Sequence, residues 1–172
     1  MCGRCLSHPP HYDQTLTLAD YAAPVAGMVA ALKFAARIDL AEVFGRLLAR
    51  REGQRPVGDH VVAVPLSFER EAERGYNQSL AIARTYARCV GVPLLDGRLL
   101  RVRHTPPQQA LARAARRRNV RGAFGIAGSL AAATVVVIDD VMTTSSTLDE
   151  VAAALKRAGA TRVLNRVVAR TP

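Results

Sequence analysis

Two adjacent carboxylates and five consecutive hydroxyl side chains are the residues of this 172-residue chain best suited to chemistry. The carboxylates of Asp139 and Asp140 can accept hydrogen bonds from paired sugar hydroxyls or contact a water bound to Mg²⁺. Hydroxyl groups can donate to phosphate oxygens, so the two sets together match a ribose phosphate. The hydroxyl residues are Thr143, Thr144, Ser145, Ser146 and Thr147.

A strand, a loop and a helix must position these side chains. The apolar run at 134–138 lacks alternation, which predicts a strand covered on both faces of a parallel sheet, and residues 148–155 have helical spacing. The loop then lies at the carboxyl end of the strand, where α/β sheets bind ligands and a helix N-terminus attracts phosphate. A capping box at Thr147 and Glu150, or at Ser146 and Asp149, is the alternative. Capping would use one or two hydroxyls, so we favour the ligand site.

The rest of the chain alternates between strand and helix patterns, which predicts an α/β fold built on a parallel sheet. Pro65 stops an apolar strand, and Gly91 ends a helix that opens near Asn77. The expected elements are two helices within 24–51, a strand at 61–64, a helix at 77–90, a strand at 99–103, the central strand and helix, and a strand at 162–169.

The composition of the chain is basic and contains no long apolar run, which is compatible with more than one function. The formal net charge is +10, and only two of the 24 basic side chains are lysines, Lys33 and Lys156. A basic balance suits a protein that handles pyrophosphate esters or nucleic acid. No run approaches the ~18 apolar residues that span a bilayer, and the first residues lack the apolar core of a signal peptide. We therefore expect a cytoplasmic protein without membrane insertion.

The N-terminus carries half of a zinc site. Cys2 and Cys5 form a C-x-x-C pair, which in a cytosolic chain indicates metal binding rather than a disulfide. A structural Zn²⁺ site needs four ligands. His8 and His11 could supply the other two, but four ligands within ten residues leave little chain to wrap the ion. We assign residues 1–20 to a partial zinc-finger-like segment and residues 21–172 to the main domain.

The central motif also resembles a known signature. Residues 138–148 resemble the segment of type I phosphoribosyltransferases that binds phosphoribosyl pyrophosphate (PRPP), and the chain is similar to the ComF/GntX family, which includes a competence protein of DNA uptake. The resemblance implies a parallel-sheet type I phosphoribosyltransferase-like fold with N-terminal helices and a remnant zinc-finger-like N-terminus. It implies catalytic roles for Asp139 and Asp140 on the ribose diol, and a 5′-phosphate cradle at residues 143–147. ComF-like proteins often carry an earlier cysteine pair, so either the start codon is misassigned or the module has decayed.

Two further segments match the family. The residues Pro65, Leu66 and Ser67 resemble its pyrophosphate loop, and residues 74–78 closely match a ComF/GntX motif. The guanidinium group of Arg74 is suited to a diphosphate because it binds two phosphate oxygens at once. Residues 32–34 match a recurrent family tripeptide, in which Lys33 is either functional or merely solvated.

One departure from the family affects the phosphate loop. The family usually has glycine where this chain has Ser145. A missing glycine tightens the loop against the phosphate or demands a strained backbone.

The segment 104–124 also has the spacing of ComF relatives, and phosphoribosyltransferases close such a segment over the substrate. Closure excludes water from a reactive sugar cation. The candidate lid residues are Tyr76, Asn77, Gln78, Gln108, Arg116 and Asn119.

The expected reaction is Mg²⁺-dependent displacement of pyrophosphate from PRPP by a nitrogen nucleophile. The first alternative is a non-catalytic competence accessory that senses PRPP or a nucleotide and docks on a helicase or another DNA-processing partner. A folded relic without a ligand is the second. Contact with single-stranded DNA is less favoured, because no aromatic residue interleaves with the arginines for base stacking. These arginines are Arg113, Arg116, Arg117, Arg118 and Arg121.

Overall fold

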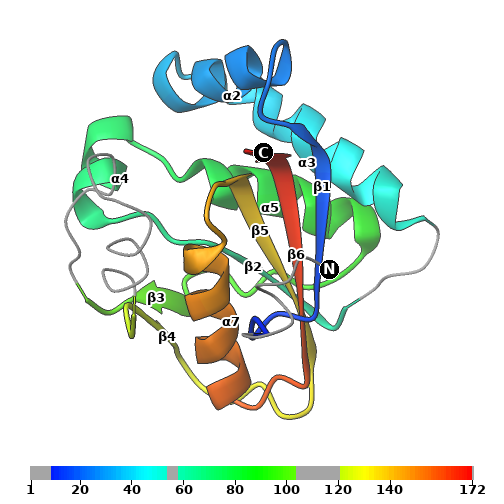
Figure 1. Cartoon of the computed structure of the whole chain (residues 1–172), viewed down its shortest axis with the longest axis vertical. Coiled ribbons are helices and arrows are strands. Elements are labelled where there is room, and N and C mark those ends of the chain that lie inside the picture. Colours follow the sequence, from blue (N-terminus) through cyan, green and yellow to red (C-terminus); the bar gives the residue numbers. More distant parts are fainter. Residues whose placement is uncertain (1–8, 54–57, 104–120, 172) are drawn as a thin grey trace.

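The computed structural model describes residues 9–53, 58–103 and 121–171 (Figure 1). In chain order the elements are β1 (Gln14–Asp20), α2 (Val25–Phe34), α3 (Asp39–Glu52), β2 (His60–Ala63), α4 (Phe68–Arg74), α5 (Gln78–Val90), β3 (Leu99–Arg101), β4 (Phe124–Ile126), β5 (Thr134–Met142), α7 (Ser146–Arg157) and β6 (Arg162–Arg170).

The main sheet of the described residues has the strand order β1-β6-β5-β2, and every neighbouring pair is parallel. This confirms the predicted α/β fold with a parallel sheet. The strand β1 pairs with β6 at one edge, so the sheet includes residues that we assigned from the sequence to the N-terminal segment. A short antiparallel pair, β3 and β4, stands apart from the main sheet.

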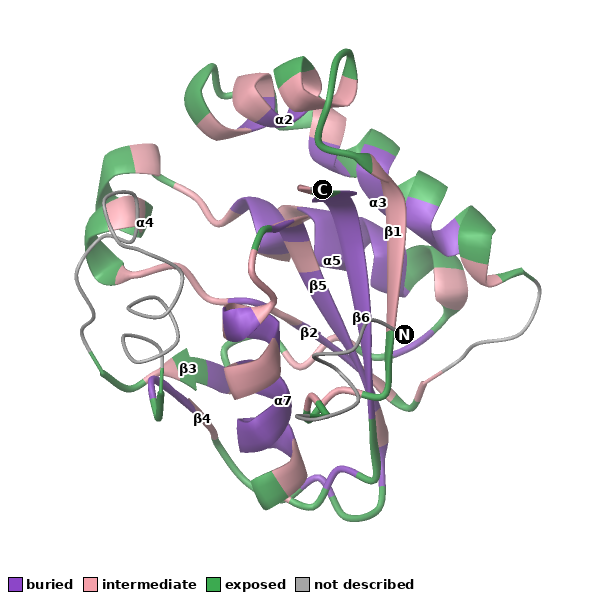
Figure 2. Ribbon diagram, viewed as in Figure 1, coloured by how far each residue is buried: buried purple, intermediate pink, exposed green. Residues whose placement is uncertain are grey.

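Helices cover both faces of the sheet, as the absence of alternation in β5 requires. The helix α7 lies on one face with β3 and β4 beside it, and α3 and α5 lie on the other (Figure 1). The sheet has a hydrophobic core on each face, and β5 contributes side chains to both. Val135 and Val137 pack towards α7, whereas Val136 and Ile138 pack towards α3 and α5. Figure 2 shows β5 and β6 buried along most of their length.

The helices α3 and α5 approach closely at Gly45. A Cβ atom added there would lie 2.7 Å from Cβ of Thr85 and 2.8 Å from the backbone oxygen of Ile82. Only a glycine therefore fits at this crossing without movement of α5. The tight contact fixes how closely α3 and the middle of α5 pack against each other.

A buried ion pair anchors the end of α3 to β6. The side chain of Arg166 is 1% exposed and that of Glu52 is 4% exposed, and Nη2 of Arg166 lies 3.1 Å from Oε2 of Glu52. The hydroxyl of Tyr86 donates to Oε1 of Glu52 at 2.7 Å. Desolvation, followed by the contact with Glu52, raises the pKa of Tyr86 above its ordinary value.

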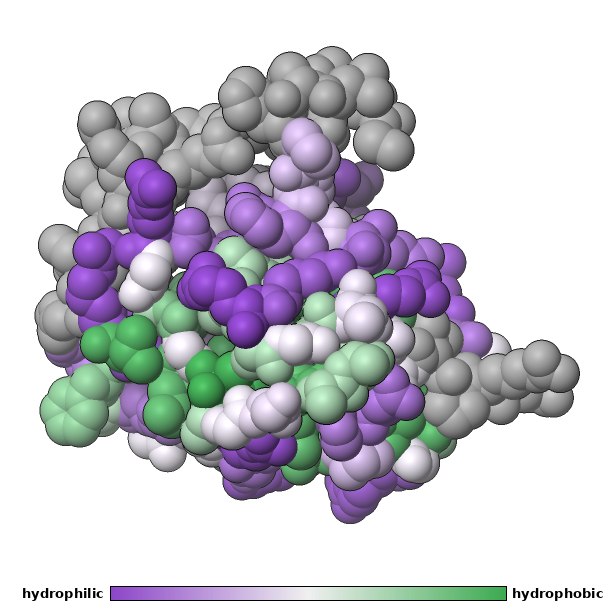
Figure 3. All heavy atoms as spheres, turned by 90° about the horizontal axis from the view of Figure 1, so that it is seen from below, coloured by the Kyte–Doolittle hydropathy of each residue, from purple (hydrophilic) through white to green (hydrophobic). Residues whose placement is uncertain are grey.

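Three described elements were not predicted from the sequence, namely β1, the short helix α4 and the short strand β4. The predicted helices within 24–51 and the predicted strands at 61–64, 99–103 and 162–169 all have counterparts. No helix within the described ranges is long and apolar enough to cross a membrane. Seen from below, hydrophilic residues spread across the described surface, with smaller hydrophobic areas between them (Figure 3).

Candidate functional site

The acidic pair lies inside β5, near its carboxyl end. The strand runs on to Met142, and Asp139 is in register with Val167 of β6. From the sequence, the acidic pair was expected at the end of the strand, and β5 extends two residues beyond Asp140. The strand continues because backbone pairing with β6 is maintained and because side chains from α2 and α5 bind both carboxylates.

Asp140 is held by groups from two helices. Its side chain is 7% exposed, its Oδ1 lies 3.1 Å from Nζ of Lys33, and its Oδ2 accepts a 2.6 Å hydrogen bond from Nε2 of Gln78. The carbonyl oxygen Oε1 of Gln78 is buried and has no hydrogen-bond partner among the described residues. Lys33 is therefore part of the site and is not a solvated lysine of α2.

Asp139 keeps one oxygen free among the described residues. Its Oδ1 accepts hydrogen bonds from Oγ of Ser79 at 3.1 Å and from the backbone N–H of Asp140 at 2.9 Å. Desolvation raises the pKa of Asp139 to about 7; the neighbouring charge of Asp140 also raises the pKa, and Lys33 opposes both effects. A carboxyl group with such a pKa exchanges its proton near neutral pH, which is common at functional sites.

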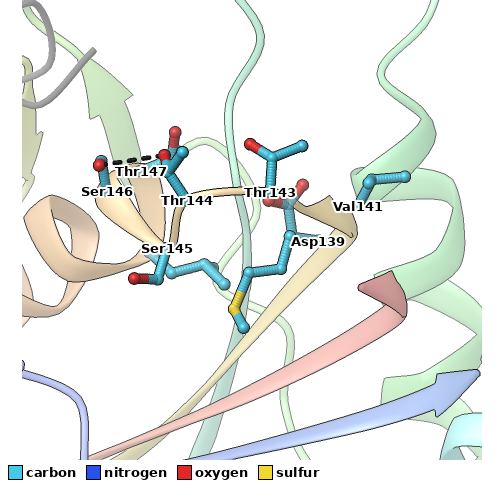
Figure 4. Close-up of a pocket in the computed structure, with 9 residues that line it drawn as sticks. Asp139, Val141, Thr143, Thr144, Ser145, Ser146 and Thr147 are labelled. Atoms are coloured by element: carbon cyan, nitrogen blue, oxygen red, sulfur yellow. Dashed lines mark hydrogen bonds between the residues drawn. The ribbon is translucent and has the colours of Figure 1, made fainter. Parts of the chain in front are cut away.

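The hydroxyl loop and Asp139 line a small hollow that opens to solvent. Figure 4 shows Thr143 beside Asp139, and Thr144, Ser146 and Thr147 grouped at the start of α7. The hydroxyl groups of Thr144 and Ser146 lie 3.1 Å apart. The side chain of Ser145 points away from this group (Figure 4).

Ser145 adopts a left-handed backbone conformation at the N-cap of α7, with φ 57° and ψ −4°. Side-chain sterics disfavour this region for every residue except glycine. The strain expected from the missing glycine is therefore present in the structure.

The first turn of α7 has no side-chain cap. Asp149 accepts a 2.7 Å hydrogen bond from the backbone N–H of His11, and Glu150 accepts one of 2.9 Å from that of Gly122. Neither predicted capping box forms, because Ser145 and not Ser146 or Thr147 is the N-cap, and the acidic member of each box binds another segment. The first amides of α7 have no partner within the helix, and they can bind an anion.

The predicted pyrophosphate loop lies at the same edge of the sheet as the acidic pair. Pro65, Leu66 and Ser67 connect β2 to α4, and β2 is parallel to β5. The N–H of Val64 still donates to the backbone oxygen of Ile138, at 3.0 Å. The loop therefore begins next to Asp139, and its residues are half-buried.

Arg74 is the last residue of α4, the helix that follows this loop. Its guanidinium carbon lies 5.1 Å from the centre of the Phe34 ring, and its Nη1 is buried without a hydrogen-bond partner among the described residues. Gly75 follows in a left-handed conformation with φ 75° and turns the chain towards α5. A ligand that accepts hydrogen bonds would satisfy Nη1 of Arg74.

Three of the predicted lid residues lie in the wall of the site instead. Asn77 caps α5 by accepting from the N–H of Leu80, and it donates to the backbone oxygen of Val64 at 3.0 Å. The hydroxyl of Tyr76 donates to the backbone oxygen of Leu32. Gln78 is buried against Asp140. These side chains fix the start of α5, so we treat them as part of the wall.

The other predicted site residues lie outside the described residues. They are Cys2, Cys5, Gln108, Arg116 and Asn119. Of the predicted arginine cluster, only Arg121 is described, and it is exposed. His11, the described member of the compact zinc alternative, contacts Asp149.

Sequence reasoning missed Ser79 and left Lys33 undecided. Lys33 is one of only two lysines in the chain, but neither residue has a local signal. Their contacts with the acidic pair depend on how α2 and α5 pack against β5.

Fold and site define a class of protein. A family model described as a phosphoribosyl transferase domain matches residues 77–171, from the N-cap of α5 to the residue after β6. In structure, the chain is similar to the glutamine PRPP amidotransferase of B. subtilis complexed with ADP and GMP, with a TM-score of 0.53 and 24% identity. That match covers 76% of this chain and 26% of the amidotransferase chain, and it shows a shared fold alone.

Curated relatives narrow the class. The DNA utilization protein YhgH of Escherichia coli K12 is 36% identical over 168 residues, which cover 94% of this chain and 74% of that protein. Competence protein F of Haemophilus influenzae is 31% identical over 167 residues, which cover 92% and 73%. The chain therefore belongs to the phosphoribosyltransferase domain family and, within it, to the ComF family.

Proposed function

We propose that this protein binds PRPP together with Mg²⁺ and transfers the phosphoribosyl group to a nitrogen acceptor. The observation that carries the proposal is the meeting of three features at one edge of the sheet. They are the acidic pair of β5, the uncapped start of α7 with its hydroxyl loop, and the loop after β2. Each suits one part of PRPP.

The 5′-phosphate would bind to the hydroxyl groups and amides at residues 143–147, because an uncapped helix start favours an anion. The ribose diol would donate to the free oxygen of Asp139. Asp140 would act mainly by its charge, since Lys33 and Gln78 already bind both of its oxygens. The pyrophosphate would bind at residues 65–67 and at Nη1 of Arg74, which is buried without a partner among the described residues.

The carboxylates of the site suit a Mg²⁺ ion for which the substrate supplies most of the ligands. No group of three or more metal-ligating side chains gathers within the described ranges. One carboxylate oxygen of Asp139 is free of contacts with the described residues, and Mg²⁺ commonly combines one or two carboxylates with substrate phosphates and water. When bound, the ion would neutralise the charge that develops on the pyrophosphate.

In the proposed reaction, the bond between the anomeric carbon and the pyrophosphate oxygen breaks, and a bond from that carbon to the acceptor nitrogen forms. The sugar passes through a cation-like state. The negative charge of Asp140, and that of Asp139 in its ionised form, would stabilise that state, and Arg74 would bind the leaving group. Catalysis would then rest on positioning and on fixed charges.

A second candidate is a non-catalytic accessory role in DNA use, with the same pocket sensing PRPP or a nucleotide. The names of the relatives, DNA utilization protein and competence protein, favour it, as does the strained Ser145. Such a protein would dock on a helicase or another DNA-processing partner in the cytoplasm, with or without contact to single-stranded DNA.

An isotope-labelled PRPP assay with each common base separates the two. Release of pyrophosphate that requires a base, Mg²⁺ and Asp140 supports transfer. Binding of PRPP without release supports the accessory role, and the absence of both excludes a PRPP site. DNA contact is tested by titrating the protein with single-stranded DNA at several salt concentrations. Binding through phosphate contacts should weaken steeply as the salt concentration rises.

A further inference from the structure

Phe34 is a large, exposed aromatic residue at the end of α2. It ends α2, its surface is 73% exposed, and it directly follows Lys33, whose ammonium group contacts Asp140. A single exposed apolar side chain is ordinary on a protein surface. The neighbours of Phe34 distinguish it from other exposed residues.

One face of the Phe34 ring is already occupied by a cation. The guanidinium carbon of Arg74 lies 5.1 Å from the ring centre, within the range of a cation–π contact. The high exposure of Phe34 leaves the rest of the ring open to solvent. Phe34 and Arg74 thus present a flat, open aromatic surface with a cation behind it.

Two contacts fix this surface relative to the acidic pair. Lys33 contacts Asp140, and the hydroxyl of Tyr76 donates to the backbone oxygen of Leu32 at the preceding position. Both tie the last turn of α2 to the site. These contacts therefore fix the position of the residue that carries the open ring relative to the acidic pair.

We infer that Phe34, supported by Arg74, is the binding surface for the flat heteroaromatic ring of the acceptor. This inference rests on the proposed function and names the acceptor class as a nitrogen-containing aromatic base. Stacking on an aromatic ring tolerates different bases, because every base has a π-face. Arg74 would then serve two partners, with its plane against Phe34 and its Nη1 towards the pyrophosphate.

The chain contains no tryptophan, so Phe34→Trp introduces a unique fluorescent reporter at the proposed surface. Phe68→Trp is the matched control, because Phe68 is 83% exposed on the neighbouring helix α4. Both proteins are titrated with adenine, hypoxanthine and uracil, with and without PRPP and Mg²⁺. We expect saturable quenching by at least one base in Phe34→Trp and none in Phe68→Trp.

Calorimetry provides a second measurement of base binding, on variants that do not introduce tryptophan. Phe34→Ala should weaken binding of the same base on the order of tenfold, and Phe34→Tyr should keep it, because the ring is retained. Phe68→Ala should leave base affinity unchanged. Equal effects of Phe34→Ala and Phe68→Ala would overturn the inference.

The titration also separates this inference from the proposed function. PRPP binding without saturable quenching by any base would leave the PRPP site in place and overturn the stacking surface. Quenching without PRPP binding would support the surface and overturn the PRPP site. Quenching by a short oligothymidylate but by no free base would overturn the acceptor assignment and indicate a nucleic-acid strand.

Discussion

The ammonium group of Lys33 lies 3.1 Å from Oδ1 of Asp140, so a helix near the N-terminus supplies the counter-charge for the acidic pair of β5. One lysine faces two adjacent carboxyl groups. Desolvation of Asp139 disfavours its charged form most, and the charge of Asp140 adds to this effect because one lysine cannot neutralise both carboxylates. The raised pKa of Asp139 follows from this arrangement.

The first prediction concerns the pH dependence of folding. The folded state holds a proton on Asp139 up to about pH 7, whereas the ordinary pKa of an aspartate side chain, which applies to the unfolded chain, is 3.8. Between these values the folded state binds more protons than the unfolded state, so the stability contribution of this group falls as the pH rises. Urea denaturation between pH 5 and 8 should show a smaller loss of stability in Asp139→Asn than in the wild type. If the stability of the wild type and of Asp139→Asn changes with pH in parallel, the pKa of Asp139 is not raised in the folded state.

The second prediction changes the counter-charge. Lys33 lowers the pKa of Asp139, so its removal in Lys33→Met should move the loss of stability to higher pH. Lys33→Arg keeps the positive charge and is the control. If stability is lost at the same pH in Lys33→Met and Lys33→Arg, the charge of Lys33 does not act on Asp139.

The third prediction concerns the strained loop. Ser145→Gly should stabilise the protein by about 0.5–1 kcal/mol, because glycine adopts φ 57° without steric cost and no side-chain cap is lost. It should also strengthen PRPP binding by relaxing the loop. Ala132 has the same φ in a turn before β5, so Ala132→Gly should add stability without changing PRPP affinity. Unchanged or weaker PRPP binding in Ser145→Gly would show that the loop accommodates serine.

The fourth prediction tests the packing that holds α5 in place. Gly45→Ala should cost about 1–3 kcal/mol, because the new Cβ would meet the backbone of α5 at 2.8 Å. Gly27→Ala is the control: no atom lies within 4 Å of a Cβ there, and alanine favours a helix by about 0.5–1 kcal/mol. Thermal and urea denaturation of the two variants should move in opposite directions. A neutral Gly45→Ala would mean that α3 and α5 separate easily.

The fifth prediction concerns the buried ion pair. Glu52→Ala should destabilise the fold by about 3–5 kcal/mol, because it leaves the charge of Arg166 buried without a partner. Glu42→Ala removes an exposed pair with Arg46 and should have little effect. If the denaturation midpoints of Glu52→Ala and Glu42→Ala fall equally, the buried pair is no more important for stability than the exposed pair.

Periodicity predicted the sheet and the helices that cover it, because burial on two faces leaves a clear pattern in β5 and β6. The strand β1 was missed although residues 15–18 alternate between threonine and leucine. The strand lies within residues 1–20, which we assigned to the partial zinc-finger-like segment. The helix α4 was missed because a single short helix with no buried residue has no periodic apolar signal.

The acidic pair and the hydroxyl loop could be found from the sequence, because their residues are contiguous. The contacts of Asp140 with Lys33 and Gln78 could not, since they join segments that are 107 and 62 residues away in the chain. The open ring of Phe34 beside Arg74 also depends on tertiary packing. Local patterns therefore located the ligand site, and only the fold showed what surrounds it.

The most direct test of the PRPP site is calorimetric titration of PRPP into the purified protein, with and without Mg²⁺. We expect Mg²⁺-dependent binding that Asp140→Asn weakens more than Asp149→Asn, because Asp149 binds His11 and not the proposed sugar site. No heat of binding under either condition, or a larger loss in Asp149→Asn, would contradict the proposed site.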